Sequence, residues 1–204
     1  MKHFKVDLEA EALLSPTSLS SANMKSIESA MSGCTSIFNT LGAGAPSKGT
    51  KEELSYSDHE MPLSLIAAGK RVGVKHVSCM TAVGANANSV EKWYAPGPGA
   101  AGGFYSSVKG KLENDIKELK FESTAIFQPS TIIGTVHTPA WVAFLAPKLR
   151  FIIPEDFWDM EVQHIAEGMV KQGEEAIKML DEGKKGEVLT FKGAGLRKWG
   201  NDSV

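Results

Sequence analysis

The sequence predicts an α/β protein with a doubly wound parallel sheet. Two observations predict it: short apolar segments of strand character alternate with longer segments of helical periodicity, and turn residues separate them. Such alternation is typical of βαβ units, which build parallel sheets covered by helices. The 204 residues, 42% of them hydrophobic, suffice for one core. We therefore expect one domain over residues 1–204, in which residues 130–204 form a small C-terminal lobe on the substrate side.

The strand candidates are short, and turn signals end them. The first alternates apolar and polar residues, and the second stops at a Gly- and Pro-rich segment that begins at Gly42. Ligands bind beyond the carboxyl ends of the strands in such sheets, so the ends at Leu41, Thr81 and Gln128 mark the expected site. The strand candidates are Phe4 to Leu8, Thr35 to Leu41, Lys75 to Thr81, Ser123 to Phe127 and Glu187 to Phe191.

The helix candidates carry apolar residues at helical spacing. In the clearest one, Leu63, Ile66 and Ala67 fall on adjacent turns, and Gly73 ends the helix. The Gly- and Pro-rich stretch from 90 to 103 is expected to be a loop. The helix candidates are Met24 to Met31, Asp58 to Val72, Phe104 to Leu119 and Gln163 to Leu180.

Composition excludes several classes of function. The 22 Lys and Arg residues are balanced by 24 Asp and Glu, which argues against nucleic-acid binding driven by overall charge and leaves a local basic patch open. The chain has no apolar run long enough for a membrane span. The N-terminus lacks the apolar core of a signal peptide, and two cysteines cannot make a disulfide framework. These features predict a cytoplasmic protein in a reducing compartment.

Other site motifs fail on their context. Gly97 to Gly102 matches the spacing of a dinucleotide fingerprint, but no strand candidate directly precedes it. Gly44 and Gly49 have the spacing of a phosphate-binding loop, but Thr50 and Lys51 follow in the wrong order. The five histidines and two cysteines show no metal-ligand spacing, so no metal is expected.

The sharpest candidate for catalysis is the pair Tyr105 and Lys109. Residues four apart share one face of a helix. A lysine cation there favours ionisation of the phenol, whose ordinary pKa is about 10. A tyrosine tuned in this way can pass a proton to or from a carbonyl or hydroxyl group. The spacing alone is weak because lysine is common in this chain, but the preceding strand ends on the hydroxyl of Thr81. That hydroxyl has an alternative interpretation, a bond to nearby backbone.

An ordered set of short motifs resembles a known family. It includes Thr81 followed by Gly84-Ala85, and Tyr105 with Lys109 and Gly110. The remaining motifs are Ile37 to Gly42, Asp58, Gly73 to Val77, Glu118 to Phe121 and Phe127 to Ser130. From about Phe4 to about Val170 the chain resembles the Tat-interacting-protein type of atypical short-chain dehydrogenase/reductase.

This resemblance implies a Rossmann-like fold that binds NADP(H) or NAD(H), with NADP favoured. Thr81 would position a substrate carbonyl, and Tyr105 would be the acid and base. Lys109 would hold the nicotinamide ribose and lower the pKa of Tyr105. The implied cofactor-binding residues are Asp7 and Leu8 at the adenine, Leu41, Gly42 and Ala43 beside the ribose and phosphates, and Met80, Tyr105, Lys109, Pro129 and Ile132 toward the nicotinamide.

Two departures from the family pattern carry consequences. The family commonly has a Ser pair where this chain has Thr81 and Ala82; if Ala82 is the matched position, the carbonyl loses its hydroxyl partner. The chain also begins at what corresponds to the third strand of the fold, so the Gly-rich phosphate-binding turn is missing and the fold is expected to be N-terminally truncated. Ile37 to Leu41 would then form an exposed apolar edge, which invites pairing with another chain or with Phe4 to Leu8.

Three functions remain open at this point. The first is an NAD(P)(H)-dependent oxidoreductase that acts on a small-molecule carbonyl or alcohol. The second is a non-catalytic binding or regulatory protein with a protein partner, which the missing phosphate turn favours. The third is an epimerase-like enzyme, because the same Tyr and Lys would serve it.

Overall fold

A four-stranded parallel sheet forms the centre of the computed structural model. The structure describes residues 21–42, 50–89, 103–134, 144–145, 148, 150–152, 154–193 and 195–196. The strand order is β1-β2-β3-β6, and every neighbouring pair is parallel. The strands are β1 (Ser36–Asn39), β2 (His76–Met80), β3 (Ser123–Gln128) and β6 (Val188–Lys192). The predicted α/β fold with a parallel sheet is confirmed.

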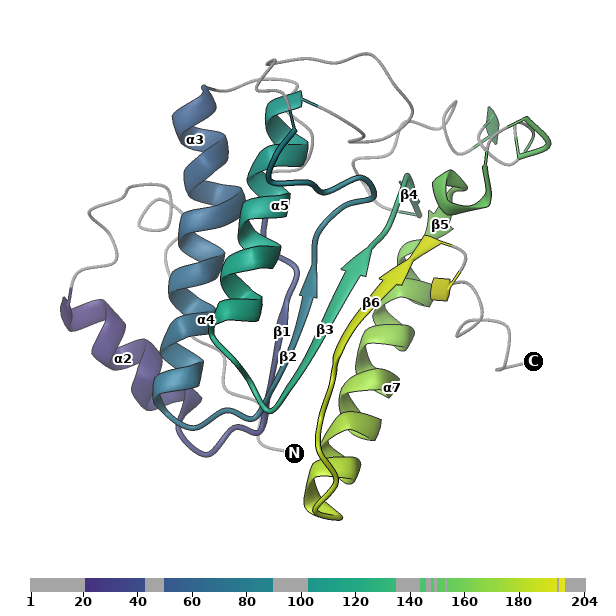
Figure 1. Cartoon of the computed structure of the whole chain (residues 1–204). Coiled ribbons are helices and arrows are strands. Elements are labelled where there is room, and N and C mark those ends of the chain that lie inside the picture. Colours follow the sequence, from purple (N-terminus) through teal and green to yellow (C-terminus); the bar gives the residue numbers. More distant parts are fainter. Residues whose placement is uncertain are drawn as a thin grey trace.

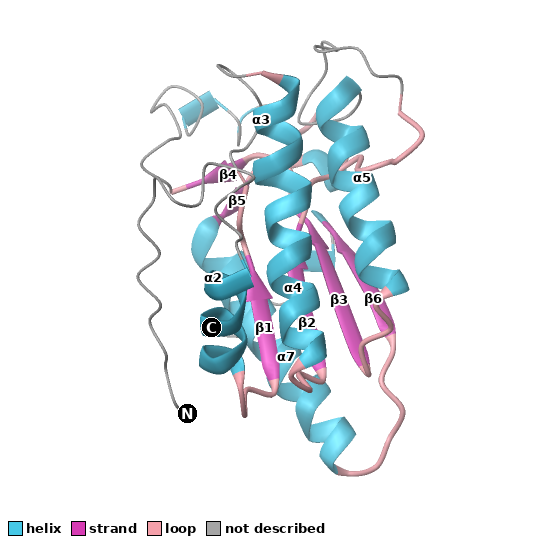
Figure 2. Ribbon diagram, turned by 90° about the vertical axis from the view of Figure 1, so that its left-hand side faces the viewer, coloured by secondary structure: helices cyan, strands magenta, loops and turns pink. Residues whose placement is uncertain are grey.

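Helices cover both faces of this sheet, as Figures 1 and 2 show. On one face lie α4 (Met61–Arg71) and α5 (Gly103–Glu118), with α2 (Ser21–Met31) packed against α4. On the other face α7 (Val162–Asp181) contacts β1, β2 and β3. The sheet is therefore doubly wound, and α5 follows β2 with its first turn near the carboxyl end of the sheet.

Alternation along β2 explains how its two faces differ. Val77 and Cys79 belong to the apolar core with Ile66, Leu112 and Ile116 of α4 and α5. A second apolar cluster lies beneath α7 and includes residues of β3, β5 and α7: Ala125, Phe127, Met160, Ile165 and Met169. Successive side chains of a strand point to opposite faces, so one strand serves both layers.

The helix predicted over Asp58 to Val72 begins seven residues earlier, at Lys51. Thr50 caps it: Glu53 N donates to Thr50 Oγ1 at 3.1 Å, and Thr50 N donates to Glu53 Oε2 at 2.8 Å. This reciprocal pair satisfies two backbone donors that the helix itself leaves open. The run continues from α3 (Lys51–Ser55) through a π-helical turn, η2 (Tyr56–Glu60), into α4. The prediction missed the Thr-x-x-Glu start signal.

β1 is an open edge of the described sheet. No described strand pairs with its outer side, and Phe38 remains 39% exposed. A cavity of about 890 Å³ runs along this edge and is lined in part by Phe38, Val170, Gly173 and Ile177. The predicted exposed apolar edge is thus present in the described residues. The strand predicted over Phe4 to Leu8 lies outside them, and the truncation stays a prediction.

Part of the C-terminal stretch belongs to the main sheet. Within residues 130–204, β6 pairs with β3 and α7 covers the sheet. A separate two-stranded sheet joins β4 (Ile132–Ile133) to β5 (Met160–Glu161), just beyond the end of β3. Arg150 binds the buried Asp159 through two contacts of 2.9 and 2.7 Å, which ties the segment before β5 to it. The division into one domain with a C-terminal lobe stays a prediction.

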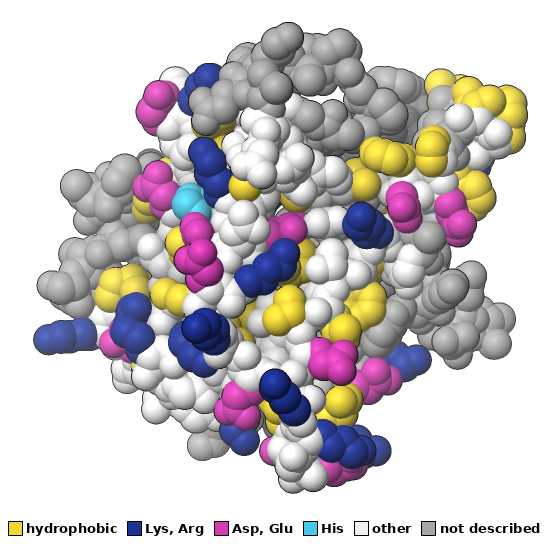
Figure 3. All heavy atoms as spheres, viewed as in Figure 1, with side chains coloured by type: hydrophobic (Ala, Val, Ile, Leu, Met, Phe, Trp, Pro, Cys, Tyr) yellow, Lys and Arg dark blue, Asp and Glu magenta, His cyan; other side chains and the backbone are white. Residues whose placement is uncertain are grey.

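The face of the molecule that Figure 3 shows carries no strongly basic patch. In Figure 3, Lys and Arg side chains are interspersed with Asp and Glu side chains over the visible face. Within the described residues, no helix has the length and apolar content to cross a membrane. The mixture of positive and negative side chains on this face agrees with the charge balance of the sequence.

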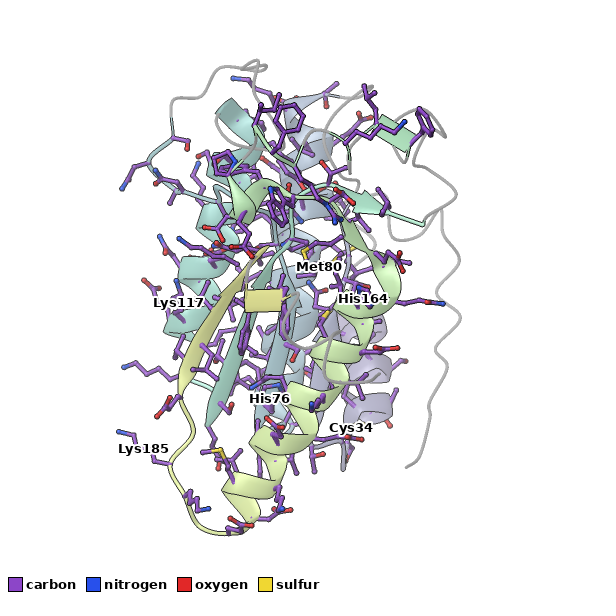
Figure 4. All side chains as sticks on the ribbon, turned by 90° about the vertical axis from the view of Figure 1, so that its right-hand side faces the viewer. Cys34, His76, Met80, Lys117, His164 and Lys185 are labelled. Atoms are coloured by element: carbon purple, nitrogen blue, oxygen red, sulfur yellow. The ribbon has the colours of Figure 1, made fainter. Side chains whose placement is uncertain are left out.

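A buried polar cluster lies between β2 and α7. His76 Nδ1 lies 3.1 Å from Ser123 Oγ, and its Nε2 lies 2.9 Å from Ser78 Oγ. Ser78 Oγ in turn donates to Gln172 Oε1 of α7 at 3.5 Å. Burial lowers the pKa of His76 from 6.5 to about 4 because the imidazolium loses its hydration. Figure 4 shows His76 at the start of β2 and Met80 at its opposite end.

His76 is expected to make the fold acid-labile. Its pKa is lower in the folded chain than in the unfolded chain, so the unfolded state gains the proton first as the pH falls. The free energy of unfolding should fall between pH 6.5 and about 4, by roughly 3 kcal/mol in total. Urea unfolding across this pH range measures the effect. His76→Gln should flatten the profile, and an equally steep profile in that variant contradicts the assignment.

Candidate active site

A cavity of about 390 Å³ lies at the carboxyl ends of β1, β2 and β3. Its walls come from the segment after β1, from η2, from the end of β2 and the two residues that follow it, from the first two turns of α5, and from the segment after β3 up to the start of β4. The lining residues are Thr40, Leu41, Gly42, Asp58, Met80, Thr81, Ala82, Tyr105, Lys109, Pro129, Ser130, Thr131 and Ile132. This is the edge of a parallel sheet at which ligands bind in doubly wound folds.

Most of the predicted site residues meet at this cavity. The proposed acid-base group, Thr81, Tyr105 and Lys109, lines it in full. Five predicted cofactor-binding residues also line it: Leu41, Gly42, Met80, Pro129 and Ile132. Asp7, Leu8 and Ala43 lie outside the described residues. Among the described residues, no group of His, Cys, Asp and Glu could hold a metal ion.

Lys109 forms a buried ion pair with Asp58. Lys109 Nζ lies 2.8 Å from Asp58 Oδ1, and both side chains are almost fully excluded from solvent. Ser57 Oγ donates to the other carboxylate oxygen, Asp58 Oδ2, at 2.7 Å. The lysine ammonium also lies 5.8 Å from the centroid of the Tyr105 ring. The ion pair therefore joins η2 to α5 directly beside the tyrosine.

The pKa of Tyr105 is shifted opposite to the expected direction. Lys109 was expected to lower it, but it is raised above the ordinary value. Burial of the phenol contributes most, and repulsion from the Asp58 carboxylate adds to it. Asp58 also balances the charge of Lys109, which explains why the lysine does not prevail. The phenol of Tyr105 therefore holds its proton more tightly than an exposed tyrosine does.

Thr81 belongs to a second buried network. Its Oγ1 donates to Glu113 Oε1 at 2.6 Å, and Gln128 Nε2 donates to the same carboxylate at 2.8 and 3.1 Å. Glu113 lies four residues after Lys109 on α5, so Tyr105, Lys109 and Glu113 form one stripe on that helix. The network links the ends of β2 and β3 to α5.

Two acidic residues of this site, Asp58 and Glu113, had no role predicted from the sequence. Asp58 was noted only as a position in the family pattern, and Glu113 was not noted. The i, i+4 spacing from Lys109 to Glu113 was available as a signal, but it could not show that both residues are buried. Asp58 lies 51 positions before Lys109 in the chain, and nothing in the local pattern pairs them.

Position 42 requires a glycine because its backbone lies directly against the ion pair of Asp58 and Lys109. A Cβ atom on Gly42 would lie 2.5 Å from Asp58 Oδ1 and 2.8 Å from Lys109 Nζ. Both distances are shorter than real Cβ contacts, so a side chain at position 42 would force the ion pair to shift. The backbone therefore reaches the ion pair only because position 42 has no side chain.

Comparison with protein-family models gives no match. Among curated proteins, the chain is 29% identical over 111 residues to protein FMP52, mitochondrial, of Eremothecium gossypii, which is 54% of this chain and 44% of that protein. It is 31% identical over 108 residues to protein FMP52-2, mitochondrial, of Scheffersomyces stipitis, which is 53% of this chain and 42% of the relative. The match spans less than half of the length of either relative.

Solved structures show the same fold at low identity. MoeE5 in complex with UDP-glucose and NAD aligns with 88% of this chain and 67% of its own, with a TM-score of 0.54 and 14% identity. ADP-L-glycero-D-manno-heptose-6-epimerase of Helicobacter pylori aligns with 93% of this chain and 76% of its own, with a TM-score of 0.53 and 10% identity. These likenesses confirm the Rossmann-like fold.

The prediction of a cytoplasmic location is wrong by this comparison. The relatives from Eremothecium gossypii, Scheffersomyces stipitis, Candida glabrata and Debaryomyces hansenii are all named mitochondrial proteins. Charge balance and the polar character of the first residues could not have distinguished the two compartments, because neither feature reports an address to mitochondria.

Substitution of Gly42 by alanine is expected to disrupt the ion pair. The new methyl group would overlap Asp58 Oδ1, so the free energy of unfolding should fall by about 1–3 kcal/mol. Gly195→Ala is the matched control, because a Cβ there meets nothing within 4 Å and should change stability by less than about 0.5 kcal/mol. Thermal unfolding of both variants measures this. Equal stability of the two variants contradicts the close approach.

Proposed function

We propose that this chain belongs to a nicotinamide-cofactor-dependent oxidoreductase of the short-chain dehydrogenase/reductase type. The observation that carries the proposal is the convergence of Tyr105, Lys109 and Thr81 on one cavity at the carboxyl ends of three parallel strands. A phenol, an ammonium group and a hydroxyl in one such cavity can hold a ribose and exchange a proton with a carbonyl. The resemblance to the atypical Tat-interacting-protein type supports the same reading.

The described residues fit the nicotinamide half of the cofactor. Gly42 brings bare backbone to the cavity wall, and Pro129 and Ile132 provide apolar surface for a flat ring. Lys109, fixed by Asp58, would hold ribose hydroxyls through its ammonium hydrogens. When bound, the cofactor supplies the hydride. The resemblance favours NADP, whereas the solved neighbour MoeE5 was obtained with NAD, so both cofactors are tested.

The chemistry that suits this site best is carbonyl reduction. Tyr105 holds its proton because its pKa is raised, and a phenol donor can protonate the oxygen of a reduced carbonyl. The O–H bond of Tyr105 breaks as the new alcohol O–H bond forms. Asp58 positions the lysine beside the phenol, so Lys109 acts within a fixed geometry instead of moving freely.

The first test separates cofactor binding from proton transfer. NADH and NADPH are titrated against the chain by fluorescence, and turnover is followed with a panel of small carbonyl compounds. Tyr105→Phe should keep cofactor affinity but lower kcat by about 10²- to 10⁴-fold, because only the acid is lost. Lys109→Met should weaken cofactor binding, whereas Lys117→Met, at an exposed position of the same helix, should not.

The non-catalytic alternative predicts a different pattern. A binding protein on this scaffold would capture a partner equally well as wild type and as Tyr105→Phe, with no effect of added NADPH. Failure of both cofactors to bind at millimolar concentration would contradict the oxidoreductase proposal for this chain.

We infer a mitochondrial location from the names of the relatives. The chain with a C-terminal epitope tag, expressed in a yeast, should sediment with mitochondrial markers during differential centrifugation. Recovery with a cytosolic marker enzyme would contradict the inference.

A further inference from the structure

We propose that Thr81 accepts a hydrogen bond from the ligand, and that Glu113 is the positioning residue that makes it an acceptor. The proposal rests on the proposed function, because it names the substrate class of the same cavity. The site would take a carbonyl compound that also carries a hydroxyl or N–H group. This differs from the role that the family resemblance implies for Thr81, which is to donate to the carbonyl.

The single hydroxyl proton of Thr81 is already engaged. A threonine hydroxyl has one donor hydrogen and two acceptor lone pairs. Thr81 Oγ1 lies 2.6 Å from Glu113 Oε1, and the next oxygen is the Phe127 carbonyl at 3.4 Å. Both partners accept, so the proton is directed into the protein. The lone pairs of Thr81 Oγ1 remain as its capacity for a further hydrogen bond, and Thr81 lines the cavity.

Burial holds Glu113 in this acceptor role. Thr81, Glu113 and Gln128 are each at most 6% exposed. A buried carboxylate needs donors, and the pair Thr81 and Gln128 supplies them. If the Thr81 hydroxyl turned toward a ligand, the Glu113 carboxylate would lose one of these two donors and keep the hydrogen bonds from Gln128. The short distance of 2.6 Å is typical of a charge-assisted hydrogen bond, which is about twice as strong as a neutral one.

This donor pattern selects the chemistry of the ligand. A carbonyl oxygen offers only lone pairs, which do not pair with those of Thr81. An alcohol or amide N–H does pair with them. Tyr105, which keeps its proton, serves the carbonyl instead. A hydroxy carbonyl compound satisfies both residues at once: its carbonyl accepts from Tyr105, and its hydroxyl donates to Thr81. Ala82, which follows Thr81 along the cavity wall, offers no replacement hydroxyl.

The test compares a matched alcohol and ketone on the full chain without cofactor. Cyclohexanol and cyclohexanone are titrated separately, and the NMR signals of the Thr81 methyl group and the Ala82 amide are followed. Cyclohexanol should shift these signals with an apparent Kd about 3- to 10-fold lower than cyclohexanone, which is the range for one neutral hydrogen bond. Equal binding of the two probes, or no shift with either, would overturn the proposal.

Variants of Glu113 and Thr81 test whether Glu113 orients the Thr81 hydroxyl or only supports the fold. Glu113→Gln keeps an acceptor oxygen for Thr81 and should keep the preference for the alcohol. Glu113→Met removes the acceptor, frees the Thr81 proton and should bring cyclohexanone to equal or tighter binding. If Glu113→Met does not fold, Thr81→Val decides: the alcohol preference should vanish at the Ala82 amide, and its persistence contradicts the proposal. Because no cofactor is used, failure of NADH to bind would affect the proposed function alone.

Discussion

The ion pair of Asp58 and Lys109 is the interaction on which the candidate site depends. Moving two charges out of water costs several kcal/mol per ion, and removing one partner leaves the other uncompensated. With 2.8 Å between Asp58 Oδ1 and Lys109 Nζ, each charge compensates the other and both stay buried. The pair fixes η2 against α5, requires a glycine at position 42, and sets the charge beside Tyr105. The ion pair thus links the cavity wall, the backbone at Gly42 and the phenol of Tyr105.

Local structure delivers these two residues to the same place. The capping box at Thr50 starts the helical run, a π turn follows at Tyr56–Glu60, and Asp58 within that turn is fully buried. On the partner helix, the spacing of four places Tyr105, Lys109 and Glu113 on one face. Lys109 then meets Asp58, and Glu113 meets Thr81. Two buried carboxylates, Asp58 and Glu113, thus hold the ammonium group of Lys109 and the hydroxyl group of Thr81 in place.

The sequence predicts the features of this protein that depend on neighbouring residues, and it does not predict those that depend on contacts between distant residues. Apolar periodicity predicted β2 and β3 within a residue or two, and the Tyr105–Lys109 spacing predicted a pair that does meet at a cavity. Tertiary effects were beyond that reasoning. The direction of the Tyr105 pKa shift depends on burial and on Asp58, which is distant in sequence. The hydrogen bond from Thr81 to Glu113 likewise depends on how the end of β2 packs on α5.

Titration of Tyr105 is the most direct test of whether burial and the Asp58 carboxylate raise the pKa of this phenol. Tyrosine labelled at the ring carbon that bears the hydroxyl reports each phenol by NMR, with Tyr105 assigned from Tyr105→Phe. In the chain without cofactor, Tyr105 should stay protonated well above the ordinary pKa of about 10, and Asp58→Asn should lower its pKa because the repelling carboxylate is gone. A Tyr105 that titrates at or below 10 in the wild type, or a pKa that rises in Asp58→Asn, would contradict the account.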